Sequence, residues 1–398
     1  MAKKRKTVTI SLSKKSIIAI VAIILIVAIV CGVLWFTAPP FKDFVIKIFN
    51  SGGESENGGL PTKLEGDVVQ MHFVDVGQGD CIILRFPDGK DMIIDAGSGS
   101  GGTENDVKNR VLDYCKRLEI DYFDYMMLTH TDADHAGVLD EVIKEYDVRE
   151  FFLPDLDASY NEPDTTKKKD GKVPTKTYFD VVAGAKAETY TDNGVQKQAV
   201  INKNVDEFKI VGVDYQIDFY CFTAEMYDKI TYGDAEEINS VSPIGILSFG
   251  GRKVVLTGDA NTITEEYFLK NHPEGIDCDV LKAGHHGSKG STTEAFLHFV
   301  DVEYVVVMAG KDNSYGHPHD EFIKRVNEYK ETNNTNGDYE TIQKTYITFN
   351  DGSILLQIAK NGGIKFDTKI FPYSAENLKA VVSAKINVYV KEEWAYAV

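Results

Sequence analysis

The sequence predicts an α/β domain that follows a single transmembrane helix. From residue 68 onwards, short apolar runs alternate with helical stretches, and polar clusters follow several of these runs. The chain has 398 residues, of which 43% are hydrophobic and 26% charged. This ordinary globular composition excludes collagenous, coiled-coil and wholly disordered proteins. One further run of twenty apolar residues near the N-terminus is long enough to cross a bilayer.

The apolar run covers residues 17–36 and contains no charged residue. As a helix it would be about 30 Å long, which matches the hydrocarbon core of a membrane. A cleaved signal peptide is the alternative, but the run is longer than the apolar core of a usual signal peptide. In addition, the small residues at its end, Thr37 and Ala38, are followed directly by Pro39 and Pro40, which is unfavourable for cleavage. Six basic residues precede the run, namely Lys3, Lys4, Arg5, Lys6, Lys14 and Lys15. The positive-inside rule therefore predicts a cytoplasmic tail at 1–16 and an extracytoplasmic body.

The rest of the chain divides by composition. Residues 37–66 read as a juxtamembrane segment and a flexible linker, 67–348 as the main domain, and 349–398 as a β-rich extension. That extension contributes extra strands or forms a small appended module. After residue 16 the chain has 37 basic and 61 acidic residues, a charge of −24, which opposes tight nonspecific binding to a phosphate backbone. The five cysteines have no paired spacing, so they indicate neither a disulfide framework nor a CxxC zinc site.

The strands and helices of the main domain follow from hydrophobic patterning and turn signals. Strands are expected at 68–76, 81–86, 91–97, 123–128, 279–288 and 303–310, with a hairpin at 244–259 and further strands at 345–359. Helices are expected near 105–118, 136–146, 263–271 and 292–300. The polar stretch 155–205 has no convincing period and is interpreted as an insertion or a long surface loop.

The histidines indicate where the chemistry lies, because six of the nine fall in three short stretches. The first stretch, residues 130–135, has the sequence His-Thr-Asp-Ala-Asp-His and follows an apolar strand. It contains four side chains able to bind a metal, namely His130, Asp132, Asp134 and His135. Capping of the next helix would explain one of these residues but not all four. The pattern therefore predicts a metal site at this strand end.

Three later strand ends carry further candidate residues. Asp259 ends an apolar strand, and a carboxylate in such a position can bridge two cations. His285 and His286 follow the next strand, and His317 follows the one after. Because ligands gather at the carboxyl ends of strands in open α/β sheets, we expect these residues to converge on one site. His319 stays unassigned, since a His-Pro-His sequence is usually a turn.

These motifs resemble those of the metallo-β-lactamase fold hydrolases, and within them the soluble hydrolase domain of the ComEC group of competence DNA-uptake proteins. The resemblance runs from about residue 68 to about 348. Its landmarks are Asp75 to Asp80, Ile94 to Gly97, the 130–135 cluster, Asn239 with Ser242, Leu256 to Asp259, His285 to Ser288, and Asn313 to Pro318. It implies a four-layer αββα sandwich, with a metallo-β-lactamase-like hydrolase domain at 67–348 and a dinuclear metal site at the sheet edges.

The sequence departs from the wider superfamily in its ligands. The superfamily has HxHxDH, whereas Asp132 stands at the second histidine position, and no histidine occurs between His135 and Asp259. Such an oxygen-rich site favours manganese or iron, with zinc still open. The implied metal ligands are His130, Asp132, Asp134, His135, Asp259 and His286, and the implied catalytic residues are Asp134, His285 and His317. His317 remains an alternative to His286 as the last ligand.

The expected function is a membrane-anchored phosphodiesterase or nuclease with two divalent cations, and DNA is one candidate substrate. The charge of −24 opposes tight DNA binding and makes smaller phosphodiesters of the cell envelope serious rivals. Hydrolysis of a lactone, thioester or amide at the same site is an alternative, because a fold does not fix its substrate. A non-catalytic, membrane-tethered binding scaffold is another. One transmembrane helix is not a multi-helix channel, so DNA import is not implied.

Overall fold

The computed structural model describes residues 67–97, 104–155, 176–230, 235–272, 274–329 and 342–371. The predicted tail, transmembrane helix and linker at 1–66 lie outside these residues, as does the chain beyond 371. Within the described ranges, no helix is both long and apolar enough to cross a membrane.

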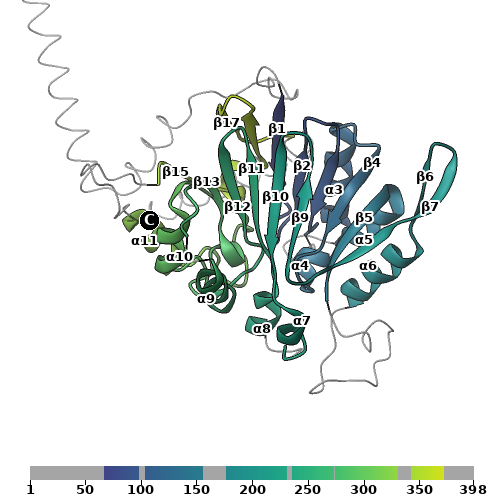
Figure 1. Cartoon of the computed structure of the whole chain (residues 1–398). Helices are drawn as coiled ribbons and strands as arrows, with labels where there is room; N and C mark the ends of the chain where they lie inside the picture. Colours follow the sequence, from purple (N-terminus) through teal and green to yellow (C-terminus); the bar gives the residue numbers. More distant parts are fainter. Residues whose placement is uncertain are drawn as a thin grey trace, which may run out of the picture. The chain divides into compact units, whose positions relative to one another are not determined.

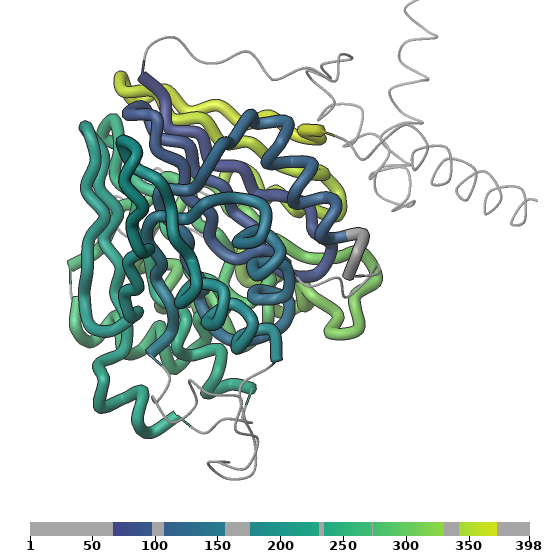
Figure 2. Tube along the Cα trace, turned by 90° about the vertical axis from the view of Figure 1, so that its right-hand side faces the viewer, coloured from purple at the N-terminus to yellow at the C-terminus, as the bar shows by residue number. Residues whose placement is uncertain are grey.

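The first sheet has eight strands in the order β17-β16-β1-β2-β3-β4-β5-β8. Their bounds are β1 (Val68–Phe73), β2 (Ile82–Arg85), β3 (Asp91–Ile94), β4 (Tyr122–Met127), β5 (Asp147–Pro154), β8 (Val200–Asn204), β16 (Ile354–Ala359) and β17 (Ile364–Asp367). Strands β3, β4, β5 and β8 run parallel, and the others pair antiparallel. Figure 2 shows the yellow C-terminal strands beside the purple N-terminal ones, where Val68 pairs with Ala359.

The second sheet has seven strands in the order β15-β14-β13-β12-β11-β10-β9. Their bounds are β9 (Glu207–Val211), β10 (Tyr215–Tyr220), β11 (Ile244–Phe249), β12 (Arg252–Leu256), β13 (Cys278–Lys282), β14 (Val302–Val307) and β15 (Lys344–Ile347). Strands β12 to β15 run parallel, which places the loops after β12, β13 and β14 at one edge. A separate hairpin consists of β6 (Thr189–Asp192) and β7 (Val195–Gln198).

Helices cover the outer face of each sheet, which gives four layers (Figure 1). The first sheet packs against α3 (Glu104–Arg117), α5 (Leu139–Glu145) and α6 (Lys176–Ala187), and the second against α9 (Thr262–Asn271), α10 (Glu294–Val300) and α11 (Asp320–Glu328). A third apolar core lies between the sheets, where Phe73 and Leu84 face Phe219 and Leu247. Four short helices complete the described fold, namely α4 (Ala133–Ala136), α7 (Ala224–Tyr227), α8 (Ala235–Ser240) and α12 (Thr348–Asp351).

The α/β fold predicted from the sequence is confirmed, with two differences. The stretch 155–205 is not a loop throughout, because its second half forms α6, the β6–β7 hairpin and β8. Helix α6 buries Tyr178, Val181, Val182 and Ala185, whose spacing is that of an amphipathic helix, whereas the polar residues around it hide this pattern. Of the two alternatives for the C-terminal extension, residues 354–367 form extra strands of the first sheet, so this sheet continues past residue 348.

Candidate metal centre

The predicted site residues lie on loops that follow four strands. The loop after β4 carries His130 and leads into α4 with His135, and the loop after β12 carries Asp259. Strand β13 leads into a short 3-10 turn, η2 (Gly284–Gly287), which contains His285 and His286. The loop after β14 carries His317. The two sheets thus bring four distant segments to one edge of the sandwich.

Asp95, which directly follows β3, orients His135. Both side chains are fully buried, and His135 Nδ1–H donates to Asp95 Oδ2 at 2.7 Å. Asp95 also accepts hydrogen bonds from the backbone N–H and the hydroxyl of Thr129, at 2.8 and 2.7 Å. In the neutral ring this contact keeps the proton on Nδ1, so the lone pair of His135 lies on Nε2. A carboxylate behind an imidazole in this way is typical of metal-binding histidines.

His286 and His130 also have Nε2 available as a ligand. His286 Nδ1–H donates to the carbonyl oxygen of Met308 at 2.8 Å. His130 Nδ1 lies 3.1 Å from the Thr129 hydroxyl, which gives its proton to Asp95, and 3.2 Å from the Ser242 hydroxyl. His130 Nε2 is buried and has no hydrogen-bond partner in the part of the chain that the structure describes. A buried lone pair of this kind is satisfied by a cation.

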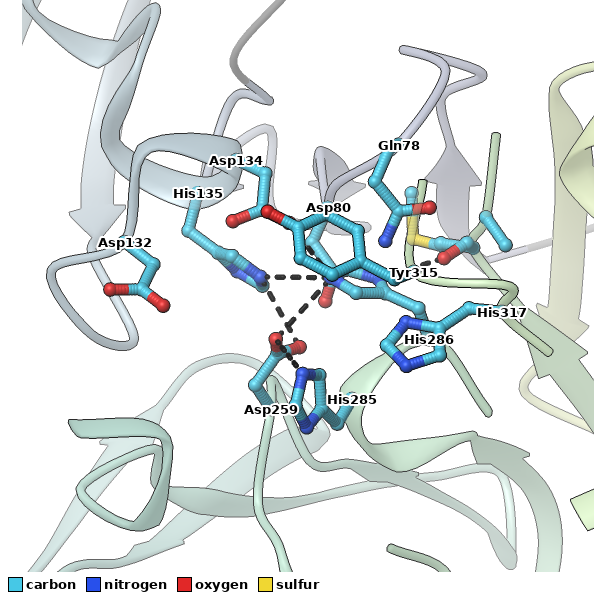
Figure 3. A network of polar contacts seen from close by, with 12 residues as sticks. Gln78, Asp80, Asp132, Asp134, His135, Asp259, His285, His286, Tyr315 and His317 are labelled. Carbon is cyan, nitrogen blue, oxygen red and sulfur yellow. Dashed lines mark hydrogen bonds and ion pairs between the residues drawn. The ribbon is translucent and has the colours of Figure 1, made fainter. Parts of the chain in front are cut away.

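Asp259 contacts His135 and His286, as the dashed lines in Figure 3 show. Its Oδ1 is 3.2 Å from His135 Nε2 and its Oδ2 is 3.3 Å from His286 Nε2. The two Nε2 atoms are 3.3 Å apart, and His286 Nε2 is also 3.3 Å from Asp134 Oδ2. Around a tetrahedral ion with metal–ligand bonds of about 2.0–2.1 Å, ligand atoms are about 3.3–3.4 Å apart. These four separations therefore match the spacing of ligand atoms around one metal ion.

A second set of potential ligands adjoins the first. His130 Nε2 is 3.9 Å from Asp132 Oδ2 and 3.9 Å from Asp259 Oδ2. Asp259 thus faces both sets, as a carboxylate shared by two cations would. Three imidazoles and three carboxylates are a donor set that fits two divalent cations, and the proportion of oxygen is compatible with manganese as well as zinc.

The pKa shifts of two of these groups reflect burial first and the crowding of like charges second. Burial, followed by the neighbouring Asp134 carboxylate, raises the pKa of Asp132 to about 6. Burial, followed by the positive charge on His135, lowers the pKa of His130 to about 3. His130 is therefore neutral at pH 7, as a metal ligand must be. Bound cations would relieve the repulsion that raises the pKa of Asp132.

His285 and His317 lie on the outer side of this cluster. His285 Nε2 is 3.8 Å from Asp259 Oδ2, and the side chain is 27% exposed. His285 and His286 have φ values of 45° and 54°, a left-handed backbone that costs non-glycine residues on the order of 1 kcal/mol each and that clusters at functional sites. The His317 ring centroid is 5.1 Å from that of His285 and 6.1 Å from that of His286.

Two further side chains lie close to this cluster (Figure 3). The ring of Tyr315 is 59% exposed and stacks on His317, with centroids 5.8 Å apart and 20° between the ring planes. Gln78 is buried, and its Oε1 accepts the backbone N–H of Gly310 at 3.2 Å. Among the described residues its amide nitrogen has no partner, so this nitrogen remains able to donate to a bound ligand.

The structure brings the predicted ligands together and adds residues that the sequence reasoning missed. Asp80, His135, Asp259 and His286 offer ligand atoms that all lie within 4.8 Å of one another, although Asp80 was named from the sequence only as the end of a landmark motif and not as a ligand. Asp95 and the buried Lys282 were not singled out as site residues. The signal for Asp95 was the Ile94 to Gly97 landmark. His286 lies inside the cluster and His317 outside it, while the assignment of individual ligands stays a prediction.

Comparison with known proteins agrees with this geometry. Residues 74–189 match the model of the metallo-beta-lactamase superfamily. The resemblance of this part of the chain to the metallo-beta-lactamase superfamily, predicted from the sequence, is thus confirmed. Members of this superfamily are generally metal-dependent hydrolases, and the fold implies divalent metal ions.

Three curated proteins resemble part of the chain. ComE operon protein 3 of Bacillus subtilis is 26% identical over 266 residues, which cover 64% of this chain and 30% of that protein. Recombination protein 2 of Haemophilus influenzae is 27% identical over 262 residues, 66% of this chain and 27% of that protein. Competence protein ComA of Neisseria gonorrhoeae is 38% identical over 77 residues, 19% and 11% of the two chains. The resemblance to ComEC-like proteins is confirmed, but the matches span less than a third of each relative.

Asp95→Asn is expected to weaken metal binding by about 10- to 100-fold while the domain stays folded. The amide can still accept one hydrogen bond, but it no longer fixes the proton of His135 on Nδ1. Titration of the metal-free protein with Mn²⁺, followed by calorimetry, would measure the change. Asp124→Asn, which alters a carboxylate paired with Arg149 on the first sheet, serves as the control. Equal affinities in the two variants would contradict the role of Asp95.

Metal binding should stabilise the domain more as the pH rises. Burial alone would lower the pKa values of His135 and His286. The nearby carboxylates, above all Asp259, together have the larger effect and hold both pKa values well above 6.5. Protonated His135 and His286 stabilise the metal-free fold at neutral pH, and this contribution is lost as the pH rises through the raised pKa values. Cations compete with the same protons. The increase in Tm on adding Mn²⁺ should therefore grow between pH 6.5 and 9, and an increase that shrinks over this range would contradict the prediction.

Proposed function

We propose that the chain is a metal-dependent phosphodiesterase with two cations in the site described above. The observation that carries the proposal is the convergence of three imidazole Nε2 atoms on Asp259, at 3.2, 3.3 and 3.9 Å. Divalent cations bound there would acidify water and offset the negative charge that develops on phosphoryl oxygens. Sites with two cations are common among enzymes that cleave phosphate esters.

The residues around the cations have separate tasks in this proposal. Asp95 holds His135 in the tautomer that binds metal, and Asp134 orients the cation from the side of α4. The free amide nitrogen of Gln78 donates a hydrogen bond to a phosphoryl oxygen. His285, at the exposed edge of the site, contacts the leaving oxygen and supplies its proton.

We propose nucleic acid as the first substrate to test. The printed names of the relatives refer to competence and recombination, which supports a DNA substrate. Tyr315 offers an exposed ring at the rim, and aromatic rings that stack on bases are a common feature of single-strand recognition. The acidic body opposes tight binding of a duplex, so single strands and small phosphodiesters come before double-stranded DNA.

The experiment is a hydrolysis assay of the purified full chain with Mn²⁺ or Zn²⁺. The substrates are single-stranded DNA, thymidine 5′-p-nitrophenyl phosphate, methyl p-nitrophenyl phosphate, a lactone and a thioester. Cleavage of the phosphodiesters that is lost on chelation supports the proposal. Hydrolysis of only the lactone or thioester would replace it with the alternative reaction. A metal-loaded protein that is inactive on all five would favour a binding scaffold.

His317→Ala is expected to keep both metal ions and to lower the rate about 10²-fold. Burial, followed by the charges of His286 and His285, lowers the pKa of His317 to about 3, so the ring is neutral at rest and affects the reaction by contact with the substrate. Elemental analysis and the rate constants for good and poor leaving groups would measure both effects. Loss of one metal ion would instead make His317 a ligand, and His286 would become the candidate proton donor.

We further propose that residues 17–36 anchor the protein in the membrane, with residues 1–16 in the cytoplasm and the hydrolase domain outside it. The uncharged run and the six basic residues before it support this orientation. Protease added to intact cells should cleave the polar stretch at 161–172. Cleavage that requires lysis of the cells would reverse the topology.

A further inference from the structure

Lys282, the last residue of β13, is fully buried directly beneath the candidate metal centre. Its Nζ donates to the carbonyl oxygen of Gly258 at 2.7 Å and lies 2.5 Å from Asp80 Oδ2. The same nitrogen is 3.9 Å from Asp259 Oδ1. Lysine is almost never fully buried without a partner, because the ammonium group loses its hydration. The burial of this lysine therefore depends on these three oxygen atoms.

The ammonium group joins the segments that supply the site. Gly258 precedes Asp259 in the loop after β12, Asp80 lies in the loop after β1, and Lys282 is three residues before His285. The Thr257 hydroxyl in turn donates to the carbonyl oxygen of Lys282 at 2.8 Å. One side chain thus fixes loops from both sheets against each other.

The position of Asp80 relative to His286 separates it from the cation set. Asp80 Oδ1 is 3.3 Å from His286 Nδ1, the nitrogen that already donates to Met308. The Nε2 atom of the same ring faces Asp259 and Asp134. Asp80 therefore lies on the side of the imidazole that is turned away from the lone pair, although its oxygen atoms are close enough to be counted with the ligands.

Charge balance leads to the same assignment. Five carboxylates surround the site, namely Asp80, Asp95, Asp132, Asp134 and Asp259. Two divalent cations would neutralise four of these charges. Within the described residues, Lys282 is the one lysine or arginine whose ion pairs reach this group of carboxylates. The positive charge of Lys282 therefore neutralises the fifth carboxylate.

We infer that Lys282 is a permanent third cation of the site, with Asp80 as its counter-ion rather than a metal ligand. It acts as a positioning residue: it holds Asp80 and Asp259 in place before metal binds. The inference rests on the proposed metal centre. It predicts that the domain without Lys282 depends more strongly on divalent cations for its stability, since no other lysine or arginine among the described residues forms an ion pair with these carboxylates.

The first test compares Lys282→Met with Lys209→Met in the full chain. Lys209 pairs with Asp218 at 2.8 Å on the second sheet, but it is 59% exposed, so its loss should change Tm little. In the presence of a chelator, Lys282→Met should lower Tm by about 10 °C. Added Mn²⁺ should recover most of that loss, and hence raise Tm more than in the natural protein. A Lys282→Met variant that behaves like the control would overturn the inference.

The second test uses Asp80→Asn, alone and combined with Lys282→Met. If Asp80 is the counter-ion, Asp80→Asn keeps two metal ions per chain, and the double variant without metal is more stable than Lys282→Met alone. If Lys282 only filled space, removing the charge of Asp80 would not restore the stability that Lys282→Met loses. Loss of a metal ion from Asp80→Asn would overturn the inference, and this result can be obtained even if Lys282→Met does not fold. A natural protein that binds no metal would instead overturn the proposed function.

Discussion

Asp259→Asn is expected to lower kcat/KM for any phosphodiester substrate by at least about 10³-fold and to remove one or both metal ions. The two oxygens of Asp259 are 3.2 to 3.9 Å from His130, His135 and His286, so one substitution removes the negative charge shared by both proposed cation positions. A cation that stabilises transition-state charge contributes several kcal/mol, and each 1.4 kcal/mol or so corresponds to a factor of ten in rate. Elemental analysis together with steady-state kinetics would measure both losses.

Two controls make this result specific. Asp218→Asn removes a carboxylate of similar size from β10, where it pairs with Lys209, and should leave metal content and rate unchanged. Circular dichroism of Asp259→Asn should show a folded domain, because asparagine has nearly the same volume and the buried cores are untouched. Full activity of a metal-free Asp259→Asn variant would mean that the site does not act through cations.

Gly79→Ala is expected to destabilise the domain strongly and to disrupt the site. Gly79 has a φ of +122°, which side chains rarely allow, and an added Cβ would lie 2.2 Å from the carbonyl oxygen of Asp134. That carbonyl accepts the backbone N–H of Asp80 at 3.1 Å. Relief of the clash must therefore move the loop after β1 away from α4. We expect a loss of about 3 kcal/mol or more in the free energy of unfolding, together with weaker metal binding.

Gly89→Ala provides the matched control for this prediction. Gly89 lies in the turn between β2 and β3 and also has a positive φ, +81°, but a Cβ added there would have no neighbour within 4 Å among the described residues. The substitution should cost only the strain of the left-handed backbone, about 1–2 kcal/mol, and leave metal affinity unchanged. Chemical denaturation and metal titration of both variants would separate strain from steric conflict. Equal effects of the two substitutions would show that the approach to Asp134 is unimportant.

The parts of the fold that could be predicted from sequence are those in which hydrophobic patterning is strong. Strand β4 and the hairpin β11–β12 are almost uninterrupted apolar runs with clear turn residues, and they form where expected. Helix α6 was missed because its apolar face has only four residues and polar sequence surrounds it. The pairing of β16 with β1 could not be predicted. Alternation of apolar and polar residues indicates which side chains of a strand are buried, but it does not indicate which distant strand lies beside it.

The same limit applies to the site. His130, His135 and Asp259 could be predicted because metal-binding residue types cluster at strand ends. Asp95 lies within the Ile94 to Gly97 landmark, but its hydrogen bond to His135 is made across the fold and is not visible in the sequence. Lys282 pairs with Asp80 in the same way, and a single lysine at the end of a strand carries no signal of such a contact. Their roles depend on burial, which only the packed structure reveals.

The pairing of β1 with β16 has a consequence for the order of events during synthesis. The first described strand leaves the ribosome early, but its hydrogen-bonded neighbour on one side lies at residues 354–359, nearly three hundred residues later. Until that segment has been made, the edge of β1 is open to pairing with other chains, and the inter-sheet core around Phe73 and Ile354 is incomplete. The first sheet is therefore completed only after residues 354–359 have been made, and until then the open edge of β1 is exposed to aggregation.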